Sequence, residues 1–220
     1  MAKIGKGVVV EFDFAVLNGA DILFETASGI LKKHGVALDS RLEAIHLAGG
    51  NCQGALAELF AKLECGADPA AVAVELNSAF NAEVTARSAA AVTPAFKNFV
   101  KTLLEKNVKV VVATRGDAAA LAEALGEPDV AVHAEMSSTY GSCKWDAWKR
   151  ACRLNALHEM LTAAVTGSGF GVRAALVAGM SALGVVNKRV EWQDFGGADD
   201  VVDVLDKKAA DIVLKMLKVA

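Results

Sequence analysis

Two runs of three valines, at 8–10 and at 110–112, constrain the fold of this chain more than any other feature of its sequence. Short β-branched runs without polar alternation are typical of strands that are buried on both faces of a parallel sheet. Segments with helical spacing separate these runs from further apolar runs along the chain. Strands that alternate with helices predict an α/β fold, in which helices cover both faces of a doubly wound, Rossmann-like parallel sheet.

The expected elements follow one another through short connections. Strands are expected at or within residues 8–12, 108–117, 130–133, 161–171 and 182–186. Helices are expected at 94–105, 118–125, 144–154 and 171–180, and residues 198–217 should close the chain as a strand fragment and an amphipathic helix. Pro94 fits this assignment, because proline is tolerated in the first turn of a helix.

The segment 20–91 has helical spacing throughout and no strand of its own. Its breaks fall near 34–35, 49–51 and 66–69, where glycine or proline occurs. A purely helical stretch between the first strand and its crossover predicts a separate helical cap. We expect this cap at residues 19–91, inserted into a core formed by residues 1–18 and 92–220.

The composition excludes several classes of protein. The formal charge of −3 offers no basic surface for a nucleic acid, and the apolar runs are too short to span a membrane. Cys52, Cys65, Cys143 and Cys152 lack zinc-ligand spacing, and a chain with this much core does not need disulfides. Because the N-terminal residues also lack the pattern of a signal peptide, we expect a cytoplasmic protein with reduced thiols.

Acidic residues follow the first strand directly. The sequence VVVEFDF places Glu11, one spacer and Asp13 at its carboxyl end. In open α/β sheets, ligands bind beyond the carboxyl ends of the strands, where the direction of the chain order reverses. A second segment, TGSGFGVRAALVAGM at 166–180, joins a strand to a glycine-rich helix start. Such a helix N-terminus favours an anion.

Together these segments resemble the haloacid dehalogenase (HAD) superfamily, in its β-phosphoglucomutase and phosphoglycolate phosphatase branch. That branch begins with a strand and D-x-D-G-[TV]-L, and carries E-D-S-x-x-G-x-x-A-A-x-x-A-G-M as its fourth motif. The resemblance covers nearly the whole chain, and it is most specific from Ser168 to Met180. It implies a phosphatase-like or phosphomutase-like hydrolase fold with a helical cap.

The resemblance also implies roles for individual residues. Glu11 occupies the place of the nucleophile, and Asp13 that of the general acid and base. The phosphoryl group would be bound by Thr114, by Lys144 at a helix start, and by the turn that contains Gly167 and Ser168. Lys144 is counted with Glu11 and Asp13 among the catalytic candidates. A small phosphorylated ligand would lie between core and cap, although the cap loop 49–53 lacks a basic residue to select it.

Three departures from the family pattern fall on one site. Glu11 replaces an aspartate, and its extra methylene moves the carboxylate forward by about 1.5 Å. Phe14 replaces a glycine, and Thr166–Gly167 replace both acids of motif four. Mg²⁺, the metal expected for the family, requires oxygen ligands, and Gly167 supplies none from a side chain. We therefore predict no cofactor and no metal site, and the loss of Mg²⁺-dependent phosphoryl transfer.

A binding or interaction role follows from this prediction, and two other functions stay open. One is an active phosphatase with altered metal ligands, in which Asp199 or Asp200 supplies the missing carboxylate. The other is nicotinamide binding at the glycines of 167–171, although their G-x-G-x-G spacing departs from G-x-G-x-x-G. The sequence does not define the oligomeric state.

Each candidate residue also has a purely structural interpretation. Glu11 and Asp13 could cap helices, Thr114 could satisfy only the backbone, and Lys144 could be solvated. The four histidines are expected to be surface or hydrogen-bonded core residues, and Trp145 and Trp148 to be packing residues.

Overall fold

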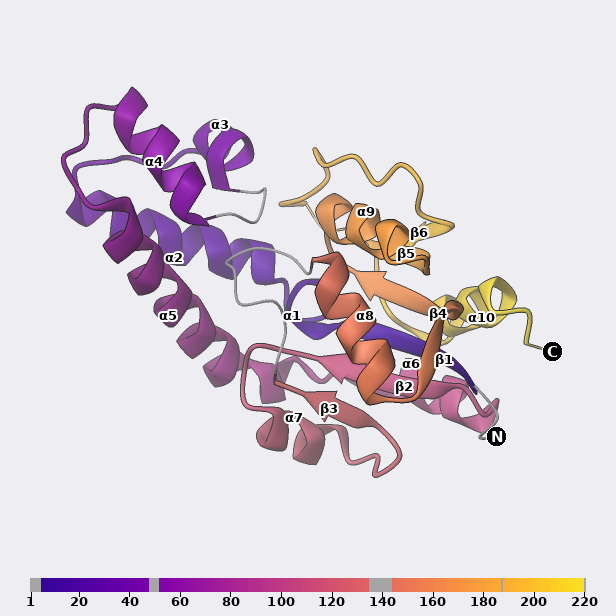
Figure 1. Ribbon diagram of the computed structural model, residues 1–220. Coiled ribbons are helices and arrows are strands. Elements are labelled where there is room, and N and C mark those ends of the chain that lie inside the picture. Colours follow the sequence, from indigo (N-terminus) through magenta and orange to yellow (C-terminus); the bar gives the residue numbers. More distant parts are fainter. Residues whose placement is uncertain (1–4, 48–51, 135–143, 187, 220) are drawn as a thin grey trace.

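The structure, a computed structural model, describes residues 5–47, 52–134, 144–186 and 188–219 (Figure 1). Its strands are β1 (Gly5–Glu11), β2 (Lys109–Ala113), β3 (Ala131–His133), β4 (Leu157–Thr166), β5 (Ser181–Val185) and β6 (Asp200–Val202). Its helices are α1 (Phe12–Ala15), α2 (Gly19–Lys33), α3 (Ser40–Leu42), η1 (Glu43–Leu47), α4 (Cys52–Lys62), α5 (Pro69–Ser88), η2 (Ala89–Ala91), α6 (Pro94–Glu105), α7 (Ala118–Leu125), α8 (Trp145–Leu154), α9 (Gly169–Val177) and α10 (Lys207–Met216).

The described strands form one parallel sheet in the order β3-β2-β1-β4-β5-β6. The chain starts in the middle at β1, moves outward through β2 and β3, and then returns to the other side of β1 at β4. This confirms the predicted doubly wound α/β fold. The reversal places the carboxyl ends of β1, β2 and β4 next to one another, which is where such sheets bind ligands.

Helices cover both faces of the sheet. Consecutive residues of a strand point to opposite faces, so neighbouring valines pack against different helices. Val8 and Val10 belong to an apolar cluster with residues of α6 and α10. Val9 faces the other way and belongs to a cluster with Trp148 of α8 and Val172 of α9. The valine runs are thus buried on both sides, as their composition predicts.

The helices α2 to α5 lie together beyond the carboxyl ends of the strands (Figure 1). Asp68 caps α5 through the backbone N–H of Ala70, and Pro69 follows in the first turn. The predicted breaks near 34–35 and 66–69 are confirmed, while the break at 49–51 lies outside the described residues. The division of the chain at residues 19 and 91 stays a prediction.

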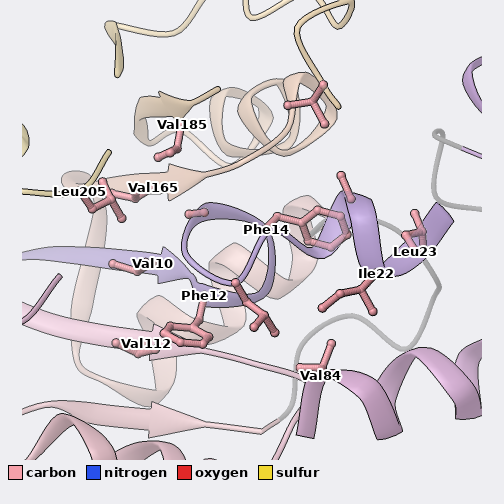
Figure 2. Packing of buried hydrophobic residues seen from close by; sticks show 14 of the residues in the cluster. Val10, Phe12, Phe14, Ile22, Leu23, Val84, Val112, Val165, Val185 and Leu205 are labelled. Atoms are coloured by element: carbon pink, nitrogen blue, oxygen red, sulfur yellow. The ribbon is translucent and has the colours of Figure 1, made fainter. Parts of the chain in front are cut away.

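One apolar cluster runs without interruption from the sheet into the helical region. Figure 2 shows Phe12 directed from α1 toward Val112, while Phe14 points toward Ile22 and Leu23 of α2. The cluster continues to Phe80 and Val84 of α5, and further to α4. The α/β part and the helical region therefore share one core. The single turn of α1 joins the two parts, with Phe12 on the side of the sheet and Phe14 on the side of α2.

Several boundaries differ from those predicted. Phe12 begins α1 and does not end β1, since the chain turns directly after Glu11. β4 begins already at Leu157, which pairs with Gly5 of β1, and the register shifts between this pair and the pair of Gly7 with Thr162. Helix α9 begins at Gly169, two residues early, because Ser168 is its N-cap.

Candidate functional site

Glu11 is the last residue of β1, and its side chain turns toward the neighbouring strand β4. It is 2% exposed, and its carboxylate accepts a hydrogen bond from the hydroxyl of Thr166, the last residue of β4. Glu11 also occupies the N-cap position of α1, but its side chain makes no capping hydrogen bond there. The Glu11 side chain thus does not cap α1, and its carboxylate links the ends of two strands.

Asp13 lies in α1 and faces the end of β2, on the other side of β1. Its Oδ1 accepts a hydrogen bond from the Thr114 hydroxyl at 2.6 Å, and its Oδ2 accepts one from the Arg115 backbone N–H at 2.8 Å. Asp13 is thus hydrogen-bonded to the loop before α7. It does not cap α7, because the N-cap residue of that helix is Asp117. Asp13 and Thr114, which the sequence analysis places at the same site, are thus in contact.

Burial raises the pKa of Asp13 above its usual value, because the charged carboxylate loses contact with water. The hydrogen bond from Thr114 and the Arg115 charge act in the opposite direction. Thr114 is fully buried, and its oxygen also accepts the backbone N–H of Gly116 at 3.0 Å. This threonine thus satisfies the backbone and binds the acid at the same time.

Gly167, which stands where the family has its motif-four aspartate, is packed against the backbone of α1. A Cβ atom at this position would overlap the carbonyl group of Phe14 and lie 3.0 Å from the Ala15 nitrogen. Backbone atoms cannot swing away as a flexible side chain can. The space for a motif-four carboxylate is therefore filled by the chain itself.

The start of α9, predicted to bind phosphate, is closed by groups of the protein. Ser168 is 3% exposed, and its hydroxyl accepts the Gly171 N–H at 2.9 Å. The Gly169 N–H donates to Gln193 Oε1 at 2.8 Å, and a Cβ at Gly169 would overlap the Asp194 carbonyl. A nicotinamide dinucleotide needs bare glycines at such a turn, and this turn has protein backbone on both sides.

Lys144 occupies the N-cap position of α8 and is exposed. Its carbonyl accepts the Ala147 N–H at 3.0 Å. The hydrogen bonds described above join Glu11 to Thr166 and Asp13 to Thr114 and Arg115, and none of these bonds involves Lys144. The catalytic role of Lys144 stays a prediction.

Phe14, Phe80 and Arg115 fill the space between the sheet edge and α5. Phe14 is 5% exposed, and its ring centroid lies 6.0 Å from that of Phe80. The Arg115 guanidinium lies 5.4 Å from the Phe80 ring centroid. Gly116 also approaches α5 closely, since a Cβ there would lie 3.1 Å from Val84 Cγ1. The sequence marks Phe14 as unusual, but only the fold brings Phe80 to it.

These residues do not fit a magnesium ion. Mg²⁺ requires several oxygen ligands in an octahedron, and no group of three or more His, Cys, Asp or Glu side chains within the described ranges could hold a metal. Asp199 accepts the Ala182 N–H, and Asp200 lies in β6. Because β6 is three strands from β1, these acids are about 14 Å away and cannot replace the missing carboxylate.

Two predictions about other side chains are only partly correct. Trp148 is fully buried, whereas Trp145 is 51% exposed, with the Lys149 ammonium 5.4 Å from its ring centroid. His133 is hydrogen-bonded to Asn155, as expected of a satisfied core histidine. Both ring nitrogens of His46 are buried and lack a hydrogen-bond partner among the residues that the structure describes, contrary to expectation.

Comparison with known proteins supports the fold at the level of structure alone. Neither the models of protein families nor the sequences of curated proteins give a match to this chain. A search of solved structures finds β-phosphoglucomutase from Clostridium difficile, with a TM-score of 0.71 and 14% identity over 98% of each chain. Another match is a phosphonoacetaldehyde hydrolase-like protein from Oleispira antarctica, with a TM-score of 0.66 and 17% identity over 99% of this chain and 95% of that one.

CbbY from Rhodobacter sphaeroides, solved in complex with phosphate, has a TM-score of 0.61 and 16% identity over 93% of this chain and 96% of that one. These similarities cover nearly the full length of this chain and of each solved structure. The chain therefore has the fold of the HAD phosphatases and phosphoglucomutases, with a Rossmann-like sheet and a helical cap region. No helix among the described residues is long and apolar enough to cross a membrane.

Proposed function

We propose that this HAD-fold protein has lost Mg²⁺-dependent phosphoryl transfer and acts as a cytoplasmic binding or interaction protein. The packing of Gly167 against the Phe14 carbonyl carries the proposal, because it removes both the metal-ligating carboxylate and the space for one. Phosphoryl transfer depends on positioned charge, and the metal neutralises the repulsion between an attacking carboxylate and a phosphate.

The hydrogen bonds of the remaining polar groups support the same conclusion. Glu11 is bonded to Thr166, and both oxygens of Asp13 accept hydrogen bonds from the chain. The Gly169 and Gly171 N–H groups at the start of α9 bond to protein oxygens. A phosphate in this place would have to displace several of these bonds. An interaction role, or a ligand held elsewhere between core and cap, agrees better with this geometry than catalysis does.

A second candidate, an active phosphatase with altered ligands, is favoured by one observation. Asp13 keeps its bond to Thr114, and burial raises its pKa. A carboxylic acid with a raised pKa is suited to donate a proton to a leaving group. This candidate requires a phosphorylated substrate that brings its own metal ion or is attacked without one.

Phosphate release from a panel of small phosphate esters separates the two candidates. The assay uses the wild-type protein and the Asp13→Asn variant, each with and without Mg²⁺, at protein concentrations high enough to detect slow turnover. We expect no release by the wild type above that of the variant. Mg²⁺-dependent turnover that disappears in Asp13→Asn would contradict the proposal and make the chain an enzyme.

A further inference from the structure

A pocket opens between the helical region and the loop that follows β5. Its volume is about 530 Å³, and Asn18, Asp21, Ser40, Lys188, Arg189 and Trp192 line it. We call it the rim pocket. None of its lining residues belongs to the predicted phosphoryl-transfer site. Its volume lies within the range of about 300–1,000 Å³ that is usual for small-molecule sites.

Arg189 is held in place from three directions. Its Nε donates to Asp21 Oδ1 of α2 at 3.1 Å, and its Nη1 lies 3.4 Å from Glu43 Oε2 of η1. Its Cζ lies 4.0 Å from the centroid of the Phe24 ring. A guanidinium fixed in this way loses little freedom when a ligand binds, which favours affinity.

Two cations and one carboxylate line the rim pocket, and Arg189 is the cation that Asp21 and Glu43 pair. Lys188 is exposed, and its ammonium group is free to move toward a ligand. Asp21, the lining carboxylate, is compensated, because its Oδ1 binds Arg189 and its Oδ2 accepts a hydrogen bond from the Asn18 amide. Glu43 contacts Arg189 but does not line the pocket.

Trp192 adds an apolar surface beside these charges. It is 46% exposed, although large aromatic residues normally bury most of their area. Indole faces are suited to planar groups, and exposed tryptophans are frequent where ligands or partners bind. A cationic group and an aromatic face in one pocket are complementary to a ligand with an anionic group on a flat body.

We propose that the rim pocket binds a small organic oxyanion, with the oxyanion at Lys188 and Arg189 and a planar body against Trp192. A carboxylate and a phosphate share this chemistry. The proposal names a ligand class for the binding role proposed above and rests on that role, but it uses a different part of the molecule.

The pH should modulate this binding through Glu43. Burial raises the pKa of Glu43 to about 6, with Asp21 acting in the same direction and Arg189 against it. Two groups face Glu43: Arg189, which belongs to the loop after β5, and Asp21, which belongs to α2. Lys188 lies in the same loop as Arg189. When Glu43 takes up a proton, Arg189 keeps one carboxylate partner fewer. Affinity for an oxyanion should therefore rise as the pH falls through about 6.

Benzoate and phenyl phosphate are the probes, titrated into the full-length protein and followed by calorimetry and by the indole N–H signal of Trp192 in NMR spectra. Trp192→Phe assigns that signal. We expect both probes to bind and to shift it. Lys188→Ala should weaken binding about fivefold, equivalent to about 1 kcal/mol. The control Lys101→Ala removes an exposed lysine of α6 and should leave the affinity unchanged.

Glu43→Gln tests the pH dependence with benzoate, which stays ionised over the range used. Near neutral pH, the variant should bind benzoate as tightly as the wild type does below pH 6. Its affinity should not change with pH over this range. Binding of only one probe identifies that oxyanion as the ligand group. The proposal is overturned if neither probe binds, or if Lys188→Ala and Trp192→Ala both bind like the wild type.

The same samples keep this proposal separate from the proposed function. Mg²⁺-dependent release of phosphate from phenyl phosphate would contradict the proposed loss of phosphoryl transfer. Ligand binding to the rim pocket would then be tested with benzoate alone, which cannot be hydrolysed. Absence of both hydrolysis and binding would overturn only the rim pocket.

Discussion

Each of the two acids at the sheet edge is bonded to a threonine at the end of a neighbouring strand. Asp13 binds Thr114 after β2, and Glu11 binds Thr166 at the end of β4. The surroundings differ. Beside Asp13, the contacts are hydrogen bonds that a ligand could exchange. Beside Glu11, Gly167 lies directly against the backbone of α1. The comparison shows that a position can exclude a carboxylate by the packing of backbone against it as well as by its residue type.

The largest effect is expected from restoring the family's acid at the filled side. Gly167→Asp would force the α1 backbone away from the start of α9 and bury a carboxylate. We expect a loss of about 3–5 kcal/mol in the free energy of unfolding, measured by urea denaturation. Gly29→Asp is the matched control, because Gly29 is exposed on α2 and a Cβ there meets nothing within 4 Å. A Gly167→Asp variant as stable as this control would show that the two sides do not differ.

A smaller effect is expected on the Asp13 side, and it depends on pH. Because burial raises the pKa of Asp13, its protonated form is favoured in the folded state. The resulting stability is fully present below the pKa of an unfolded aspartate, and it is lost as the pH rises through the raised value. Asp13→Asn should remove this loss, so that the stability of the variant falls less than that of the wild type as the pH rises.

Urea unfolding at a series of pH values measures this slope. Asp117→Asn serves as the control, because asparagine caps helices about as well as aspartate, so the N-cap of α7 is kept. If wild type and Asp13→Asn show the same pH profile, then Asp13 is not held in an environment that disfavours its charge, and the contrast between the two sides weakens.

The fold and the Asp13 side were accessible from the sequence for a simple reason. Short β-branched runs specify buried parallel strands, and the carboxyl ends of adjacent parallel strands meet at one edge. The pairing of Asp13 with Thr114 follows directly. Ser168 as the N-cap of α9 could also have been found, because serine before a glycine-rich helix is a frequent cap.

The remaining features depend on tertiary approach, which the local pattern does not encode. Nothing near Gly167 in the sequence indicates that α1 packs on it, and the contact of Phe14 with Phe80 joins residues far apart in the chain. Arg189 likewise meets Asp21 and Glu43 only because the loop after β5 reaches α2 and η1. The sequence showed that the metal ligands were missing but not that their space was filled.

The central claim is tested most directly by titrating Mg²⁺ into the isotope-labelled protein and following the backbone amide signals of Asp13, Thr114 and Gly167 by NMR. We predict that these signals do not shift in a saturable way at millimolar Mg²⁺, because no group of three or more His, Cys, Asp or Glu side chains in the described part of the chain could hold the ion, and Gly167 supplies no carboxylate. Saturable shifts at all three residues, abolished by Asp13→Asn, would show that the ion is bound there and would contradict the loss of the metal site.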